Sequence, residues 1–316
     1  MAALIALMIP GFILRKLKLF KDGAVAGLVS VLLYICQPML SISPFLEQDT
    51  SPTSYIAILM GLCFLISFFG HIAVFILAKL IFFKWKNKES ASAYTFASVF
   101  TNCGFLGIPF VKMLTNSSTA VLFAVIYNIA FCMLIWTLGI YILTGDKKAI
   151  SFKKAFLNPS IVPLVISLPL FFIPSINIIS GTPIAYSIGL LANMSAPLSM
   201  IIVGIKLADM GILNAIKGTG NYLGSFVRLI LAPSLMLGLI FLLKLIPYFS
   251  NTAEGLLALA VPVILMGMPP AALLVTFAEK TNRAKIDSTR IFLTATLLSV
   301  ITVPLLIITV KAIGLV

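Results

Sequence analysis

The chain has 316 residues, of which 61% are hydrophobic and only 10% are charged, and its formal net charge is +13. Soluble domains usually carry about 25% charged residues, so the composition excludes a soluble globular protein and predicts an integral membrane protein. An excess of Lys and Arg would indicate nucleic acid as a partner of a soluble protein, but here these residues cluster in short loops between apolar runs, as in multi-pass membrane proteins.

Ten apolar segments follow one another, most of them close to the roughly 20 residues that a helix needs to cross a bilayer. In chain order they cover residues 1–15, 24–45, 54–83, 92–113, 118–143, 159–174, 183–208, 219–246, 253–278 and 289–312. Strands of a membrane β-barrel would instead show short segments of alternating polarity. The sequence therefore predicts an all-α integral membrane protein with ten transmembrane helices.

The loops between these segments alternate in charge. Most of the 22 Lys and Arg residues lie in one set of loops, which comprises residues 15–22, 84–89, 146–154, 206–217 and 279–290. Cytoplasmic loops of membrane proteins are enriched in Lys and Arg. This set is therefore predicted to face the cytoplasm, which places both termini outside it.

Three groups of prolines recur at an offset of about 160 residues: Pro10 with Pro169, Pro38 with Pro197, and Pro109 with Pro269 or Pro270. Residues 1–143 and 159–316 each hold five segments, joined by a cytoplasmic linker at 144–158. Because five is odd, the two halves enter the membrane from opposite sides, as in the inverted repeats of secondary transporters. The sequence thus predicts two inverted five-helix repeats.

The fourth and ninth helices are each interrupted, by TNCGFLGIP (101–109) and by LMGMPP (265–270). In lipid, such a break must be buried in protein or line a wet cavity, and the half-helix that follows presents free amides and partial positive charge to an anion. The alternative is that these residues merely kink two helices. We predict a shared site at the breaks, formed by Thr101, Asn102, Gly104, Gly107, Pro109, Gly267, Pro269 and Pro270.

Over essentially its whole length the chain resembles the auxin efflux carrier family of the bile/arsenite/riboflavin transporter superfamily, and four stretches carry the resemblance: GFILRKLKLF (11–20), NCGFLGIPF (102–110), SAPLSMIIVGIKLA (195–208) and MGMPPAALLVTFAEK (266–280). The family includes plant auxin exporters and bacterial permeases proposed for malate or malonate. The resemblance implies two inverted five-helix repeats in which the fourth and ninth helices cross.

The resemblance also implies a division of labour among the helices. Helices three to five and eight to ten would form a moving transport domain, and helices one, two, six and seven a static scaffold, through which a homodimer could form. Transport would follow an elevator-like motion. The chain lacks the long cytoplasmic loop of many plant carriers, which favours a bacterial-type permease of the inner or plasma membrane.

Two ionisable residues inside the predicted helices are further candidates. Arg228 lies about nine residues into helix eight, and intramembrane charges are expensive and often functional. It could bind a carboxylate, or it could extend its guanidinium to the cytoplasmic interface. His71, the only histidine, could couple transport to protons or could simply pack between helices.

Polar residues on the predicted scaffold could face the substrate path. Gln37 and Asn193 each lie close to a proline of helices two and seven, and they are candidates for substrate contact. The alternative is that polar residues here mediate ordinary helix packing. Tyr127 and Asn128 in helix five are weaker candidates of the same kind.

These features predict a secondary active transporter of small organic anions, either carboxylates such as malate and malonate or auxin-like aromatic acids. A membrane sensor or receptor on a transporter-like core, or a channel, is the alternative. The chain carries no HExxH, GxSxG or P-loop pattern, so we expect neither an enzyme nor ATP hydrolysis. The expected partners are the anion and the lipid bilayer, without nucleic acid, metal or cofactor.

Overall fold

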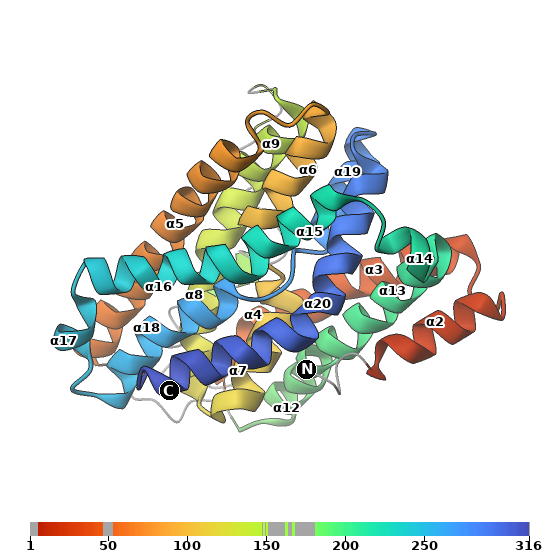
Figure 1. Ribbon diagram of the computed structural model, residues 1–316. Coiled ribbons are helices and arrows are strands. Elements are labelled where there is room, and N and C mark those ends of the chain that lie inside the picture. The colour runs from red at the N-terminus through yellow and green to blue at the C-terminus, as the bar shows by residue number, and fades with distance from the viewer. Residues whose placement is uncertain are drawn as a thin grey trace.

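The computed structural model describes residues 6–46, 53–146 and 181–315, with a few isolated residues between 147 and 180 (Figure 1). In these ranges every regular element is a helix. Most of the predicted segment 159–174, with Pro169, and most of the linker 144–158 lie outside the described residues.

In chain order the described helices, including the π-helical turns labelled η, are α2 (Met8–Lys16), α3 (Asp22–Val31), η1 (Leu32–Cys36), α4 (Gln37–Leu46), α5 (Ser54–Phe82), α6 (Lys88–Val99), η2 (Cys103–Gly107), α7 (Ile108–Thr115), α8 (Ser118–Leu134), η3 (Ile135–Gly139), α9 (Ile140–Thr144), α12 (Pro183–Asn193), α13 (Ser195–Met210), α14 (Ile212–Ala215), α15 (Thr219–Phe226), η6 (Val227–Leu231), α16 (Ala232–Leu242), α17 (Leu245–Phe249), α18 (Ala253–Met266), α19 (Leu273–Thr281) and α20 (Lys285–Ala312). Consecutive elements often continue one another as a single long helix.

Six helical runs of the described chain are long and apolar enough to cross a membrane: Gly23–Ser43, Ser54–Phe82, Ser118–Thr144, Pro183–Met210, Thr219–Leu242 and Lys285–Ala312. They coincide with six of the ten predicted segments. The predicted fourth and ninth segments are each divided, into α6 and η2–α7 and into α18 and α19. The all-helical membrane class is confirmed, whereas the count of ten helices and the inverted repeat stay predictions.

Prolines account for the positions of three of the π-helical turns. The turns η1, η2 and η6 each end two residues before a proline, namely Pro38, Pro109 and Pro233. Proline has no N–H, and its ring collides with the carbonyl four residues earlier, so the turn that precedes it cannot keep the regular α-helical hydrogen bonds. Such π-bulges occur frequently at functional sites, and η2 and η6 both carry residues predicted for the site.

The helices pack in two groups. In the first, α2 lies along α13 and α12 packs on α4. In the second, α5, α6, α8, α16 and α18 pack on one another, with α15 and α20 beside them, and they contribute most of the large hydrophobic core. Figure 1 shows the first group around α2 and α13 and the second around α5, α8 and α18.

The contact between α2 and α13 depends on two glycines. A β-carbon added at Gly204 would overlap the carbonyl oxygen of Met8, and one added at Gly11 would overlap the carbonyl oxygen of Ile201. Close backbone approach at small residues is a common way for membrane helices to associate. These two positions therefore hold α2 directly against α13.

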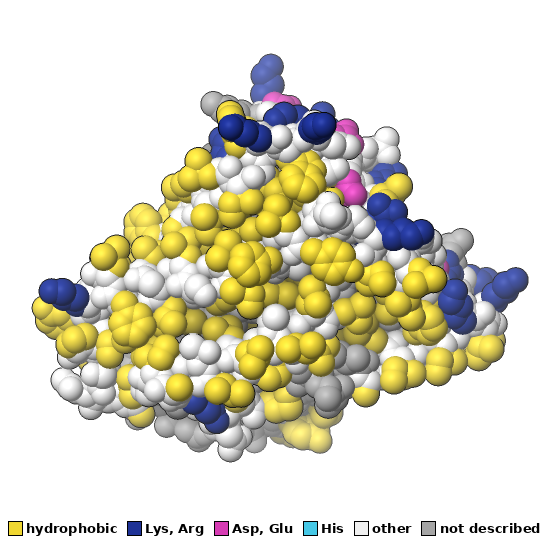
Figure 2. Space-filling model, in the orientation of Figure 1, with side chains coloured by type: hydrophobic (Ala, Val, Ile, Leu, Met, Phe, Trp, Pro, Cys, Tyr) yellow, Lys and Arg dark blue, Asp and Glu magenta, His cyan; other side chains and the backbone are white. Residues whose placement is uncertain are grey.

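The molecular surface matches a membrane-embedded protein. Figure 2 shows a broad apolar surface across this face, with Lys and Arg gathered mainly at its edges, over the ends of α6 and α9 and around α14 and the end of α2. Lipid tails favour such an apolar belt, and basic residues are enriched next to the cytoplasmic surface.

Candidate functional site

The two helix breaks meet as a pair of short extended segments. Thr101 and Pro270 form an antiparallel bridge, and the amide nitrogen of Asn102 donates to the carbonyl oxygen of Pro269 at 2.7 Å. The hydroxyl of Thr101 also donates to the carbonyl oxygen of Leu265, at 2.7 Å, near the end of α18. The two interrupted helices are thus tied together at their breaks.

Both prolines take part in this crossover. Pro269 supplies an acceptor, Pro270 stands opposite Thr101, and the next residue, Ala271, donates its amide to the carbonyl oxygen of Phe100 at 2.8 Å. Because proline cannot donate, the two backbone bonds between the segments are donated by Asn102, to Pro269, and by Ala271, which follows the proline pair. The two breaks thus supply hydrogen-bond partners for each other's backbone inside the protein, as the interior of a membrane requires.

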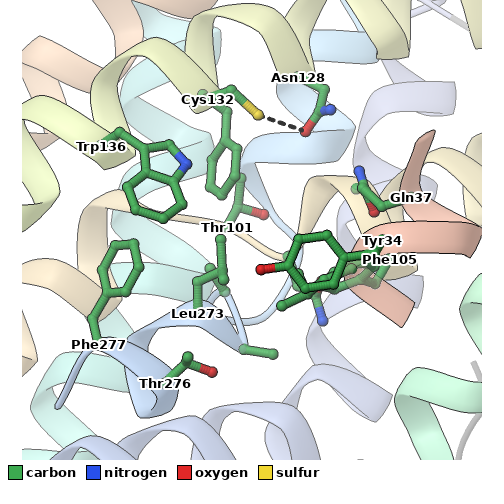
Figure 3. A pocket seen from close by; sticks show the side chains of 16 residues that line it. Tyr34, Gln37, Thr101, Phe105, Asn128, Cys132, Trp136, Leu273, Thr276 and Phe277 are labelled. Carbon is green, nitrogen blue, oxygen red and sulfur yellow. Dashed lines mark hydrogen bonds between the residues drawn. The ribbon is translucent and has the colours of Figure 1, made fainter. Parts of the chain in front are cut away.

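A pocket of about 110 Å³ opens beside the crossover (Figure 3). Its polar wall consists mainly of three carboxamides, from Gln37 on α4, Asn102 in the break and Asn128 on α8. The thiol of Cys103 donates to Oδ1 of Asn128 at 3.3 Å, whereas the buried Oε1 of Gln37 has no hydrogen-bond partner in the described chain. The side chain of Asn102 does not cap the helix that follows it. The pocket therefore offers amide groups to a ligand.

Aromatic rings lie on two sides of the pocket. Figure 3 shows Trp136 and Phe277 together on one side of it and Tyr34 with Phe105 on the other. The rings of Trp136 and Phe277 meet edge to face, with their centroids 5.0 Å apart. None of the described residues that line this pocket is Asp, Glu, Lys or Arg, so a charged ligand would be held there by dipoles and not by a charged side chain.

Two helix N-termini reach the pocket. Gly104 and Phe105, in the first turn of the helix Cys103–Thr115, line it, as do Leu273, the first residue of α19, and Ala272 just before it. The amides of these four residues come before the first hydrogen-bonded turn of each helix. Free amides and about half a positive charge at each N-terminus favour an anion.

A larger cavity of about 390 Å³ adjoins the pocket, and the two share five lining residues: Leu33, Phe105, Ala272, Leu273 and Thr276. It extends toward α3 and α13, and Lys206 of α13 lines it. Its other walls are mostly apolar. The two cavities together could hold a carboxylate at the crossover and the rest of an organic anion beside it.

The structure places two predicted site residues elsewhere. Pro109 and Asn193 line a third cavity, of about 200 Å³, together with Lys112 and Asn116 at the end of α7 that points away from the crossover. The third cavity and the pocket both border the half-helix Cys103–Thr115, the pocket at its N-terminal end and the third cavity one or more turns nearer its C-terminal end. A role for Pro109 and Asn193 in substrate passage stays a prediction.

Two predicted glycines lie in helix contacts. A β-carbon at Gly107 would come within 2.5 Å of Cδ2 of Leu265, and one at Gly267 would overlap the side chain of Leu306. Neither glycine lines the three cavities described above. The structure therefore gives Gly107 and Gly267 the role of letting the broken helices pack closely.

Arg228 lies behind the crossover, and its side chain is fully buried. One terminal nitrogen, Nη1, donates to the carbonyl oxygens of Ser98 at 2.8 Å and of Val99 at 3.0 Å, and Nη2 donates to the carbonyl oxygen of Met266. The guanidinium is thus directed to the two broken helices and not to the cytoplasmic interface. It does not line the three cavities described above.

His71 is also fully buried. Its Nδ1 lies 2.7 Å from the carbonyl oxygen of Ser67, and because a carbonyl only accepts, Nδ1 carries the hydrogen. Nε2 faces the hydroxyl of Tyr127 at 3.5 Å, and the ring packs against those of Tyr127 and Phe100. These contacts describe a satisfied packing residue, and a coupling role stays a prediction.

The structure adds Trp136 and Thr276 to the predicted pocket, and it places there Asn128, which the sequence indicated as a weaker candidate. A carboxamide in the middle of an apolar segment is a candidate for function or for helix packing. Trp136 and Thr276 look like ordinary membrane-helix residues in the sequence, so only the tertiary arrangement identifies them.

A sequence model of a family described as membrane transport protein matches residues 1–153 and residues 148–307. The two matched segments together span nearly the whole chain and meet close to residue 150. A search of curated proteins finds no significant match.

Proposed function

Because the chain belongs to the auxin efflux carrier family of membrane transport proteins, we propose that it carries small organic anions across the membrane by secondary active transport. The chain is a multi-pass membrane protein with apolar helices long enough to span a bilayer, and its family consists of transporters rather than enzymes. The proposed site is the pocket at the crossover.

One observation carries the anion specificity: two helix N-termini and three carboxamides converge on a pocket whose described lining has no charged side chain. Free amides at helix ends bind carboxylates without an opposing charge. The pocket of about 110 Å³ suits a carboxylate group, and the adjoining cavity of about 390 Å³ can take the remainder of the molecule. Malate, malonate and auxin-like aromatic acids are the proposed substrate classes.

The packing of the helices supports an elevator-type mechanism. The group around α2, α4, α12 and α13 is the proposed scaffold, and the group around α5, α6, α8, α18 and α20 is the proposed transport domain. The pocket lies between them, since α4 contributes Gln37 and α8 contributes Asn128. Movement of the second group against the first would carry a bound anion across the bilayer.

The proposal extends to the setting of the protein in the membrane. Basic loops on the cytoplasmic side would place both termini outside the cytoplasm of a bacterial cell. A homodimer through the scaffold helices is the proposed assembly, because such a dimer leaves the transport domains free to move.

Uptake into proteoliposomes tests the proposed function. Purified protein is reconstituted and given labelled malate, malonate or indole-3-acetate under imposed proton, sodium or potential gradients. We expect accumulation of at least one anion, and faster entry when the vesicles are preloaded with the unlabelled anion, since exchange distinguishes a carrier from a channel. Entry of none of the anions under any gradient would contradict the proposal.

Substitution of Gly104 by alanine tests the position of the pocket. A β-carbon there would lie 2.9 Å from Nε2 of Gln37 and 3.4 Å from Oδ1 of Asn128, so the methyl group enters the polar wall. We expect uptake to fall about tenfold, with little change in melting temperature because the end of the Gln37 side chain can move. Gly27→Ala, on α3 with open space around it, is the control that keeps full uptake.

A further inference from the structure

Arg228 contacts the ends of two half-helices at once. Ser98 and Val99 form the end of α6, and Met266 ends α18, and the carbonyl oxygens of all three accept hydrogen bonds from the guanidinium. Carbonyls in the last turn of a helix have no partner within the helix, and each C-terminus carries about half a negative charge. One arginine thus serves the C-terminal ends of both broken helices.

Among the residues that the structure describes, no carboxylate is paired with the charge of Arg228. Its side chain is fully buried, and none of the described Asp or Glu residues forms an ion pair with it. A buried charge without a compensating partner strongly destabilises the folded protein. Two helix C-termini of about −0.5 each sum to roughly one negative charge, so the ends of α6 and α18 are the counter-charge of this arginine.

The same arrangement of carbonyls has a known use in transporters with broken helices. Carbonyls of the unwound segments and of half-helix C-termini coordinate the coupling Na⁺ in such proteins. In this chain a guanidinium donates to the carbonyls at that position, so an ammonium-sized or metal cation would have to displace it.

We infer that Arg228 is the resident cation of the crossover: a positioning residue that holds the ends of α6 and α18 together and takes the place of a bound coupling cation. The crossover then needs no Na⁺ to balance the helix C-termini in either orientation of the carrier. The consequence for transport rests on the proposed function, whereas the binding of a cation can be measured without any substrate.

A substrate-free experiment tests the inference on the purified full-length protein. Melting temperatures in detergent are compared in choline chloride and in NaCl at equal ionic strength, with low concentrations of guanidinium chloride as a further probe. We expect wild type to melt at the same temperature in both salts. Arg228→Gln should melt at a lower temperature in choline chloride and regain stability, in a saturable manner, with Na⁺ or guanidinium. The melting temperature of Arg228→Lys in choline chloride should lie between those of wild type and Arg228→Gln.

Arg283→Gln is the matched control. Arg283 also donates to carbonyl oxygens at a helix end, those of Leu143 and Thr144 in α9, but it lies near the protein surface. Its substitution should give no saturable response to Na⁺ or guanidinium. A response equal to that of Arg228→Gln would show a general salt effect and overturn the inference.

Two further outcomes would overturn it. The first is a saturable rise of the wild-type melting temperature with Na⁺, which shows that the protein binds a metal cation although Arg228 is in place; this holds even if Arg228→Gln fails to fold. The second is an Arg228→Gln protein as stable in choline chloride as wild type. In the uptake assay, a wild-type rate that depends on Na⁺ would contradict the inference while supporting anion transport, and an absence of uptake would contradict only the proposed function.

Discussion

Replacing Asn102 with alanine is expected to lower uptake of the transported anion about 10- to 100-fold. Asn102 lies in the break of the first interrupted helix, its backbone pairs with Pro269, and its side chain lines the pocket. A hydrogen bond to a charged group contributes about 1.5–3 kcal/mol, and each 1.4 kcal/mol changes an affinity tenfold. Because alanine keeps the backbone pairing, the loss should appear in uptake and not in stability.

Asn102→Asp sharpens this test, because it keeps the shape of the side chain and places a negative charge at the pocket. We expect a larger loss of uptake than with alanine, since like charges repel in a site of low dielectric constant. Asn214→Ala, an exposed asparagine on α14, is the control with full uptake. Normal uptake by both Asn102 variants would place the substrate outside this pocket.

Replacing Gly204 with leucine is expected to prevent α2 from docking on α13. A β-carbon at this position overlaps the carbonyl oxygen of Met8, so the side chain meets backbone that cannot rotate away. Overpacking of a well-packed contact costs about 1–3 kcal/mol, and more where backbone must move. We expect a clear fall in melting temperature and loss of the monodisperse peak in fluorescence-detected size-exclusion chromatography.

Gly61→Leu is the matched control for this substitution. Gly61 also lies within a long helix, α5, but it is exposed and a β-carbon there meets nothing within 4 Å. It should leave the melting temperature nearly unchanged. Equal stability of the Gly204 and Gly61 variants would mean that α2 does not lie against α13 as closely as the structure indicates.

The sequence alone determined the class of the protein and the position of its helix breaks. Apolar runs of membrane length and a proline's missing N–H act locally, so the breaks near Pro109 and Pro270 could be predicted without knowledge of the fold. The sequence also singled out Asn102, Thr101 and Gly104, which the structure places together at one pocket. That these residues bind substrate stays a prediction.

Only the tertiary structure decided what surrounds each break. The partners of Arg228 are carbonyl groups of α6 and α18, and every residue has a carbonyl, so no pattern of side chains could reveal them. Likewise, Pro109 and Asn193 line a different cavity from the one that Asn102 lines. Helix periodicity specifies which residues share a face of one helix, but the register between helices far apart in the chain is set by packing, as at Gly204 and Met8.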